Sequence, residues 1–173
     1  KERGATGNHF LFDTVRGDNK YVNSNTSDQE YTESGGMAFN SDGFTLGNWG
    51  SVNNNSDTFA SWNWKAGGSA SSNSDGSITS SVSANTTAGF SIVTYTGTGS
   101  NATIGHGLGA VPNMYIVKKR NATSQWYTYH SGNTSAPETD HLLLNTNDAT
   151  SDSDTRFQDT APTSSSIYIC LLY

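Results

Sequence analysis

Residues 104–119, IGHGLGAVPNMYIVKK, place three glycines around a single histidine, immediately before an apolar stretch. A dinucleotide-binding loop would need a helix after the glycines and an acidic residue about twenty positions further on. Here Pro112 and the β-prone residues 114–117 follow instead, and the Gly-Lys-Ser/Thr ending of a phosphate-binding loop is absent. The stretch therefore predicts a sharp corner that leads into a strand, with His106 bonding to nearby backbone.

Short apolar stretches bounded by turn residues recur on both sides of this corner. They are rich in β-branched and aromatic residues, which is typical of strands. The most helix-like segment, residues 27–33, is too polar to bury a face. We therefore expect an all-β chain folded as an antiparallel β-sandwich of the jelly-roll or lectin-like kind. The expected strands cover residues 10–12, 43–46, 58–64, 89–95, 114–118, 126–129, 141–144 and 166–170.

Composition excludes several classes of function. The chain has 9 lysines and arginines against 15 aspartates and glutamates, so its net charge is −6 and no nucleic acid is expected as a partner. No membrane is expected either, because the sequence lacks a run of about eighteen apolar residues. The single cysteine, Cys170, can form neither an internal disulfide nor a cysteine-based zinc site.

Two parts of the sequence resemble each other in the same order. The segment KERGATGNHFLFDT at 1–14 matches KKRNATSQWYTYHS at 118–131. This match predicts two copies of a β-unit of about 120 residues. The paired residues are Phe10 with Tyr127, Phe12 with Tyr129, Val22-Asn23 with Leu144-Asn145, Phe39 with Phe157, and Trp62/Trp64 with Tyr168/Cys170.

The two copies are not equally complete. Two strands, near 89–96 and 113–119, precede the Lys-Lys-Arg of the second copy, whereas the first begins at its own Lys-Glu-Arg. We therefore expect the first copy to be truncated on its N-terminal side. Alternation along residues 58–64 also predicts that Ala60, Trp62 and Trp64 face the core. The expected organisation is a partial β-unit at 1–66, a Gly/Ser-rich linker that could add one strand at 67–88, and a second β-unit at 89–173.

The sequence shows no catalytic or metal-binding pattern. Its four histidines lack metal-ligand spacing, and no Gly-x-Ser-x-Gly nucleophile motif occurs. We therefore expect no catalytic residue, no metal and no cofactor, and interpret the chain as non-enzymatic. The acidic residues 147–154 predict a solvated loop, because the glycine and distal glutamate of an EF-hand are missing. Trp49 and Trp126 are the candidate residues for stacking on a sugar, the alternative being ordinary packing inside the sandwich.

A family resemblance covers nearly the whole chain. Residues 59–120 read FASWNWKAGGSASSNSDGSITSSVSANTTAGFSIVTYTGTGSNATIGHGLGAVPNMYIVKKR, with WYTYHS and HLLLNT downstream and FLFDTVRG, YVNSNTSDQE and FNSDGFTLG upstream. These phrases resemble a repeated β-domain of marine bacteriophage and cyanophage virion proteins of the tail-fibre type. The resemblance implies a β-sandwich in an extracellular appendage of the virion. It also implies that other virion subunits are the partners and that the protein forms a homo-oligomer, a trimer. The ending CLLY at 170–173 departs from the family pattern, and we assign no function to it.

Three functions remain open at this stage. The first is a virion module that presents polar loops to a host-surface glycan or spaces a fibre. The second is a glycan-degrading module of the same appendage, which needs two carboxylates about 5–10 Å apart in a groove. Convergence of Asp13 and Glu30 beside Trp49 or Trp126 would favour this second function. The third is a bacterial surface adhesin repeat.

Overall fold

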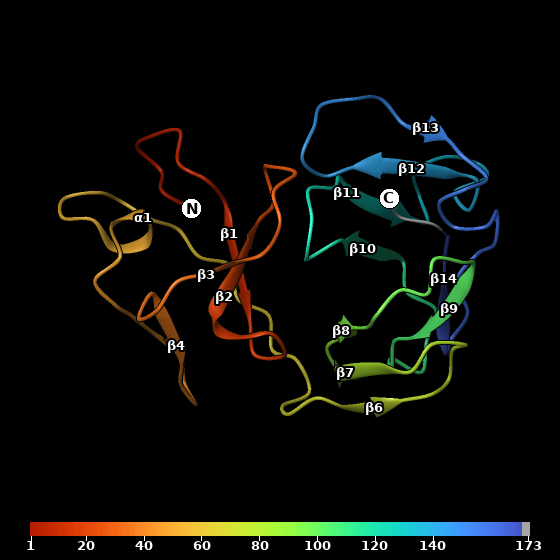
Figure 1. Cartoon of the computed structure of the whole chain (residues 1–173), viewed down its shortest axis with the longest axis horizontal. Coiled ribbons are helices and arrows are strands. Elements are labelled where there is room, and N and C mark those ends of the chain that lie inside the picture. The colour runs from red at the N-terminus through yellow and green to blue at the C-terminus, as the bar shows by residue number, and fades with distance from the viewer. Residues whose placement is uncertain (171–173) are drawn as a thin grey trace.

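The structure is a computed structural model that describes residues 1–170, so the end of the CLLY tail, residues 171–173, lies outside the described residues. Strands make up 35% of the chain and helix only 2%, and the sheets are antiparallel. The expectation of an all-β chain is therefore confirmed. Figure 1 shows two lobes, a red-to-yellow N-terminal lobe that holds β1–β5 and a green-to-blue C-terminal lobe that holds β6–β14.

The N-terminal lobe contains a three-stranded sheet in the order β1-β2-β3 and a separate hairpin, β4-β5. A single helical turn, α1, follows the hairpin. The bounds are β1 (Phe10–Asp13), β2 (Gly17–Asn23), β3 (Tyr31–Thr32), β4 (Met37–Phe39), β5 (Phe44–Leu46) and α1 (Gly50–Asn53).

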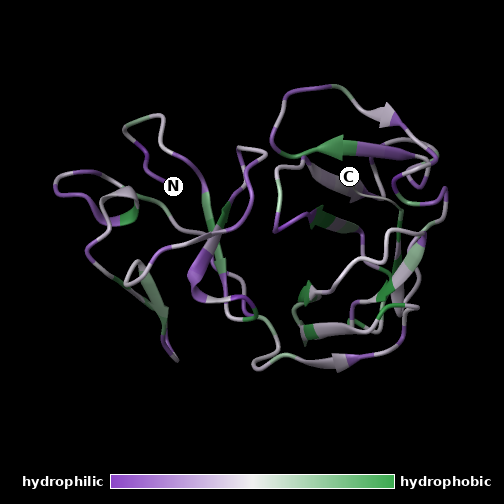
Figure 2. Ribbon diagram, in the orientation of Figure 1, coloured by the Kyte–Doolittle hydropathy of each residue, from purple (hydrophilic) through white to green (hydrophobic). Residues whose placement is uncertain are grey.

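The C-terminal lobe contains three sheets, in the orders β6-β7-β8, β9-β14 and β10-β11-β12-β13. Figure 2 shows that several strands of this lobe contain hydrophobic residues. The bounds are β6 (Ser71–Asn73), β7 (Ser80–Asn85), β8 (Phe90–Thr94), β9 (Ala102–Gly105), β10 (Met114–Lys118), β11 (Trp126–His130), β12 (Asp140–Leu143), β13 (Ser151–Asp152) and β14 (Ser166–Ile169).

Most of the buried apolar residues lie in the C-terminal lobe, where nine of them form two clusters, whereas Val22 is buried in the N-terminal lobe. One joins Ile78, Ile104 and Ile167 between the sheets, and the other packs Tyr127 and Tyr129 against Phe157. The second cluster is aromatic: the Phe157 ring meets Tyr129 edge-on with a centroid separation of 5.9 Å. Edge-on pairs of this kind are favourable beyond the area they bury.

The glycine-histidine stretch forms the predicted corner. Gly107 and Gly109 have φ angles of +69° and +70°, which glycine adopts without steric cost. The buried His106 ring accepts the Leu108 N–H at Nδ1 (3.2 Å), so its other nitrogen, Nε2, carries the proton and donates to the Thr163 carbonyl (3.2 Å). No helix follows the glycines among the described residues, so the stretch offers no helix N-terminus to a phosphate.

Two sheets, one in each lobe, share the same strand pairing. In β1-β2-β3 the strand β2 pairs with both neighbours, and in β11-β12-β13 the strand β12 does the same. Four residue pairs of the first sheet have a counterpart in the second. They are Phe10–Asn23 with Tyr127–Leu143, Leu11–Val22 with Thr128–Leu142, Lys20–Thr32 with Asp140–Asp152, and Tyr21–Tyr31 with His141–Ser151.

In both sheets an asparagine two residues after the middle strand makes equivalent hydrogen bonds. Asn25 Oδ1 accepts the His9 N–H (2.8 Å), and Asn145 Oδ1 accepts the Trp126 N–H (3.0 Å). The amide of Asn25 also donates to the Asn8 side chain (3.0 Å), and the amide of Asn145 donates to Gln125 in the same way. Each of these asparagines therefore links the turn after the middle strand to the start of the neighbouring strand, β1 or β11.

The threonine that follows each asparagine also repeats its role. Thr26 Oγ1 accepts the Asp28 N–H (3.4 Å), and Thr146 Oγ1 accepts the Asp148 N–H (3.3 Å). The expected match of Val22-Asn23 with Leu144-Asn145 is wrong by two residues, because the hydrogen bonds equate Asn25-Thr26 with Asn145-Thr146.

The expected core role of Trp62 and Trp64 is wrong. Their side chains are 66% and 64% exposed. Residues 58–64 form no strand, and their sheet contact is a single bridge between Phe59 and Glu2. Without a neighbouring strand, the alternation of the sequence has no sheet face to bury against.

The structure also places Phe39 and residues 67–88. Phe39 is 37% exposed on β4, whereas Phe157 is 1% exposed, so the two do not share an environment. Trp49 packs on Phe10 and Phe12 at centroid distances of 4.8 and 6.3 Å, and Tyr21 packs on the same two rings at 5.3 and 5.8 Å. Residues 67–88, expected as a linker that could add one strand, hold β6 and β7, and β7 pairs with both β6 and β8.

Candidate functional site

A joint between the two lobes positions the site. The loop between β2 and β3 lies against the turn between β10 and β11, as Figure 1 shows where the lobes meet. Backbone bonds fix this contact: the Glu30 N–H donates to the Arg120 carbonyl (2.7 Å), and the Ser124 N–H donates to the Ser27 carbonyl (2.8 Å). The Lys118 ammonium donates to the same Ser27 carbonyl (3.2 Å).

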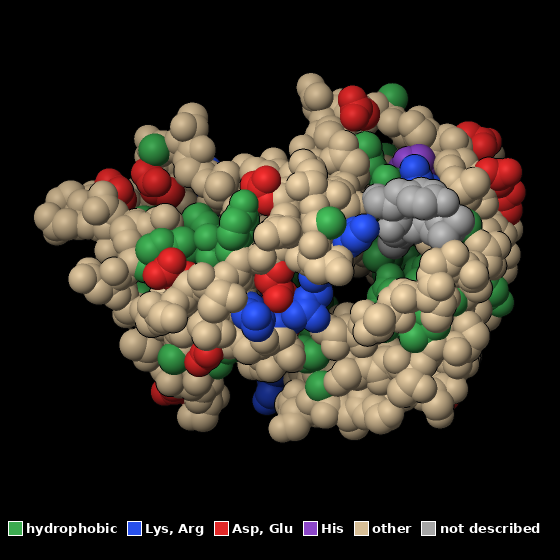
Figure 3. Space-filling model, in the orientation of Figure 1, with side chains coloured by type: hydrophobic (Ala, Val, Ile, Leu, Met, Phe, Trp, Pro, Cys, Tyr) green, Lys and Arg blue, Asp and Glu red, His purple; other side chains and the backbone are tan. Residues whose placement is uncertain are grey.

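Glu30 is the centre of the charges at this joint. Its carboxylate accepts two hydrogen bonds from Arg120, at 2.8 and 2.9 Å, and a third from Arg16 at 3.3 Å. Lys20 Nζ lies 3.7 Å away, and Asp13 pairs with the other side of Arg16. Figure 3 shows this mixed group of red and blue side chains at the middle of the molecule. Burial alone would raise the pKa of Glu30, but the bonds and charges of Arg120 and Arg16 outweigh it and lower that pKa.

The lowered pKa of Glu30 predicts how the stability of the joint depends on pH. A carboxylate with a depressed folded-state pKa contributes stability above its unfolded value, here 4.5, and loses it as the pH falls through the folded-state value. We expect the free energy of unfolding of the native chain to exceed that of E30Q at neutral pH. The difference should shrink only below about pH 4.5 in urea titrations. A difference that persists unchanged at pH 3 would contradict the ion-pair account.

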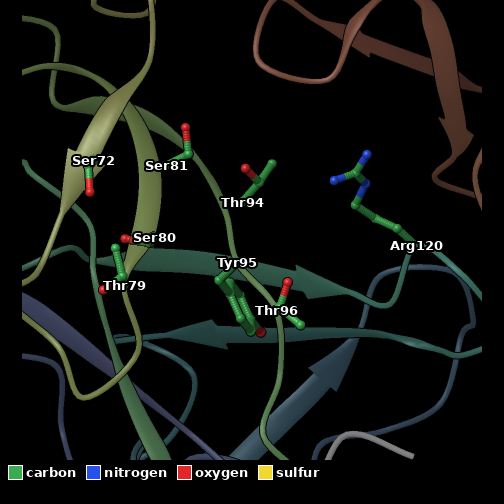
Figure 4. Close-up of a pocket in the computed structure, with 8 residues that line it drawn as sticks. All are labelled: Ser72, Thr79, Ser80, Ser81, Thr94, Tyr95, Thr96 and Arg120. Carbon is green, nitrogen blue, oxygen red and sulfur yellow. The ribbon is translucent and has the colours of Figure 1, made fainter.

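A cleft of about 810 Å³ lies beside the joint. A second hollow of about 390 Å³ adjoins it and shares Thr94, Tyr95, Thr96 and Arg120 with it. Figure 4 shows the Ser and Thr side chains of β6–β8 on one side of the smaller hollow and Arg120 on the other. Both lobes contribute to the cleft, because Gln29 and Glu30 come from the β2–β3 loop and the other lining residues from the C-terminal lobe.

Hydroxyl groups without internal partners line the smaller hollow, and those of Thr94 and Thr96 also line the cleft. Five of these hydroxyl groups make no side-chain hydrogen bond to another described residue. They belong to Ser72, Thr79, Ser81, Thr94 and Thr96. The ring of Tyr95 packs on the buried isoleucine cluster, and burial raises its pKa to about 12, so its hydroxyl stays protonated. The walls of the smaller hollow are therefore mostly polar.

Cations stand at the rim of the cleft. Lys118, Lys119 and Arg120 line it together with one carboxylate, that of Glu30. The Nη1 group of Arg120 makes no bond to a described residue, and neither does the Lys119 ammonium. Free donors of this kind can bind hydroxyl, carboxylate or sulfate oxygens of a ligand.

The cleft lacks the groups that covalent catalysis needs. None of its hydroxyls has a histidine or carboxylate as hydrogen-bond partner among residues 1–170, so no nucleophile is activated there. Asp13 and Glu30 do converge, but on the guanidinium of Arg16. A glycosidase acid requires a raised pKa, whereas that of Glu30 is lowered. In the described part of the chain, no group of three or more His, Cys, Asp or Glu side chains could hold a metal ion.

Neither tryptophan expected to stack on a sugar lies in the cleft. Trp126 is only 5% exposed, and its indole N–H donates to the carbonyls of Asn23 (3.1 Å) and Thr26 (2.9 Å), so it serves the contact between the lobes. This ring face is not accessible to a sugar, which corrects the expected role of Trp126. Trp49 is half-buried among Phe10, Phe12 and Tyr21. Sequence reasoning named Glu30 but missed the serine and threonine residues, because these residue types give no individual signal.

One protein-family model matches residues 1–171, which is nearly the whole chain and both lobes. The chain belongs to the DUF7483 family. The description of this family is "Domain of unknown function", so membership in DUF7483 brings no substrate with it. No curated protein and no solved structure matches this DUF7483 chain. No helix within residues 1–170 combines the length and the apolar character needed to cross a bilayer.

Proposed function

We propose that this chain is a non-enzymatic module of a phage virion appendage, of the tail-fibre type, whose interlobe cleft binds a host-surface glycan. The cleft, with its free hydroxyls and rim cations, is the observation that carries the proposal. Sugars are bound by arrays of directed hydrogen bonds, and a site built on strands holds such donors and acceptors in place. The resemblance to marine phage virion proteins supports the location.

The proposal includes the finer architecture. The lobes are two copies of one β-sandwich unit of jelly-roll or lectin-like kind, and the first copy is the less complete. The matched strand pairs and the repeated Asn25 and Asn145 contacts support this duplication. In the virion the chain associates with other subunits, as a trimer, which is one of the closed rotational symmetries that homo-oligomers adopt. An adhesin repeat would use the same cleft, and neighbouring genes for capsid or tail proteins distinguish the two.

The charges at the rim favour an acidic sugar. Five of the nine lysines and arginines gather at the joint and cleft, although the whole chain has a net charge of −6; they are Arg16, Lys20, Lys118, Lys119 and Arg120. Three of them line the cleft against the single carboxylate of Glu30. A carboxylated or sulfated glycan therefore gains charge-assisted bonds that a neutral one does not.

A glycan array and a whole-cell binding assay test this function. We expect the native chain to retain acidic glycans, and T94V to bind them at least about fivefold more weakly, because one hydrogen bond is worth roughly 1 kcal/mol. T86V is the matched control, since Thr86 is exposed at the β7–β8 turn away from the cleft. K119A should weaken the binding of acidic glycans more than the binding of neutral ones. Absence of binding to every glycan and host cell would refute glycan attachment and favour a spacer.

A further inference from the structure

The strand β1 is the edge of its sheet, whereas its counterpart β11 is an inner strand. In the C-terminal lobe, β10 pairs antiparallel along the whole of β11, with Tyr115 opposite Tyr129 and Val117 opposite Tyr127. No strand of the described chain pairs with the corresponding side of β1. The N-terminal lobe therefore lacks one strand that the C-terminal lobe has.

This difference leaves aromatic side chains partly uncovered. In the C-terminal lobe the Tyr115 ring from β10 stacks on Tyr129 at a centroid distance of 4.8 Å and an angle of 15°, and Tyr129 is buried. The matching residues of β1, Phe10 and Phe12, are only half-buried, and Leu11 between them is 36% exposed. Figure 3 shows green hydrophobic side chains open to solvent on the N-terminal lobe.

We propose that the free edge of β1 binds an extended strand of a separate partner, antiparallel to β1, with the side-chain pattern of β10. The partner places an aromatic side chain opposite Phe12 and a β-branched one opposite Phe10. Addition of a strand to an open sheet edge is a common mode of peptide recognition, in which backbone bonds give affinity and alternate side chains give specificity. The proposal does not rest on glycan binding, because it uses a surface other than the cleft.

The side-chain pattern of β10 indicates which residues the partner strand should carry. Tyr115 and Val117 are the residues of β10 that pack inward, whereas Met114 and Ile116 point outward and are exposed. An aromatic side chain opposite Phe12 would stack on it as Tyr115 stacks on Tyr129. The outward positions of the partner are free to be polar. An edge strand with exposed apolar residues is otherwise a site of uncontrolled pairing, so a cognate strand also protects it.

The hydrogen bonds of the added strand can be assigned from β11. The Trp126 N–H and carbonyl both bond on the β12 side, to Asn145 and Leu144. Alternation in an antiparallel sheet then directs the backbone groups of Tyr127 and Tyr129 toward β10, where Val117 and Tyr115 lie opposite. A partner strand bonds to β1 through the N–H groups at these two positions, and the N–H at the Ile116 position points away.

Three synthetic peptides test the proposal on the unmodified chain. The parent peptide has the sequence NMYIVKK of residues 113–119. A second carries N-methyl groups at the positions of Tyr115 and Val117, and a third carries one at the position of Ile116. We expect the parent and the third peptide to shift the NMR amide signals of residues 10–13 with similar affinity. The doubly methylated peptide should bind at least about tenfold more weakly, a loss of 1.4 kcal/mol.

Other outcomes overturn the proposal. Equal binding by all three peptides would show that apolar contact, without strand pairing, holds them. No shift with the parent peptide at about 1 mM would show that the edge accepts no such strand. Sedimentation of the chain alone would reveal self-association, and a dimer that occupies the β1 edge would assign it to a second copy.

Discussion

Replacement of Trp126 by alanine should lower the free energy of unfolding by about 3–5 kcal/mol, the range for a buried aromatic residue. The side chain is 5% exposed and donates its indole N–H to two carbonyls of the N-terminal lobe, those of Asn23 and Thr26. The alanine variant loses the buried apolar area and leaves both carbonyls without this donor. Urea unfolding followed by far-UV circular dichroism measures the change.

Two variants separate packing from hydrogen bonding. W126F keeps a large ring but has no donor, so we expect a loss of about 1–3 kcal/mol, the cost of unpaired buried polar groups. W62A is the matched control, because Trp62 is 66% exposed and its loss should change stability by about 0.5 kcal/mol or less. If W126A stayed within about 1 kcal/mol of the native chain, the indole would not be holding the lobes together.

The interlobe contact of Trp126 also has a consequence for ligand binding. The β2–β3 loop that receives the indole bond at Thr26 also carries Gln29 and Glu30 into the cleft. Loosening this loop separates the wall that the N-terminal lobe supplies from the Ser/Thr wall of the other lobe. A variant such as W126F, which should still fold, is therefore expected to bind any glycan that spans both walls more weakly than the native chain does.

Local sequence pattern predicted β8, β10, β11, β12 and β14 of the C-terminal lobe, but it missed β6, β9 and β13. The expected stretches at 114–118, 126–129 and 166–170 are apolar and β-branched, and each forms a strand. The pattern failed where pairing depends on distant partners. β2 is polar in sequence, GDNKYVN, yet lies between two strands, and residues 58–64 are aromatic yet lack a strand neighbour.

The candidate cleft could not be predicted for the same physical reason. Its walls join Gln29, Ser81 and Arg120, which are distant in sequence and meet through the packing of the two lobes. The aromatic signal favoured Trp49 and Trp126, but aromatic side chains are recruited to interiors as readily as to binding surfaces. The sequence did contain usable information: Asn-Thr-x-Asp occurs at 25–28 and at 145–148, at two turns in which the threonine accepts the same aspartate N–H.

Replacement of Phe157 by alanine is the second substitution for which we expect a large loss of stability. We expect F157A to lose about 3–5 kcal/mol, because its ring is 1% exposed and meets both Tyr115 and Tyr129 edge-on, at 5.1 and 5.9 Å. F39A, at the position that the sequence match paired with it, should lose about 1 kcal/mol or less, since Phe39 is 37% exposed. Thermal and urea unfolding of the two variants measure this contrast.

The same comparison decides which residue of the N-terminal lobe is the counterpart of Phe157. If Trp49 is the counterpart, W49A should be the costly substitution in that lobe, because Trp49 packs on Phe10 and Phe12 as Phe157 packs on Tyr129. Its cost should stay below that of F157A, since no strand equivalent to β10 covers the face. A loss for F39A equal to that for F157A would restore the pairing of Phe39 with Phe157. Equal losses for W49A and F157A would instead show that the face of β1 is already closed, and would leave no place for an added strand.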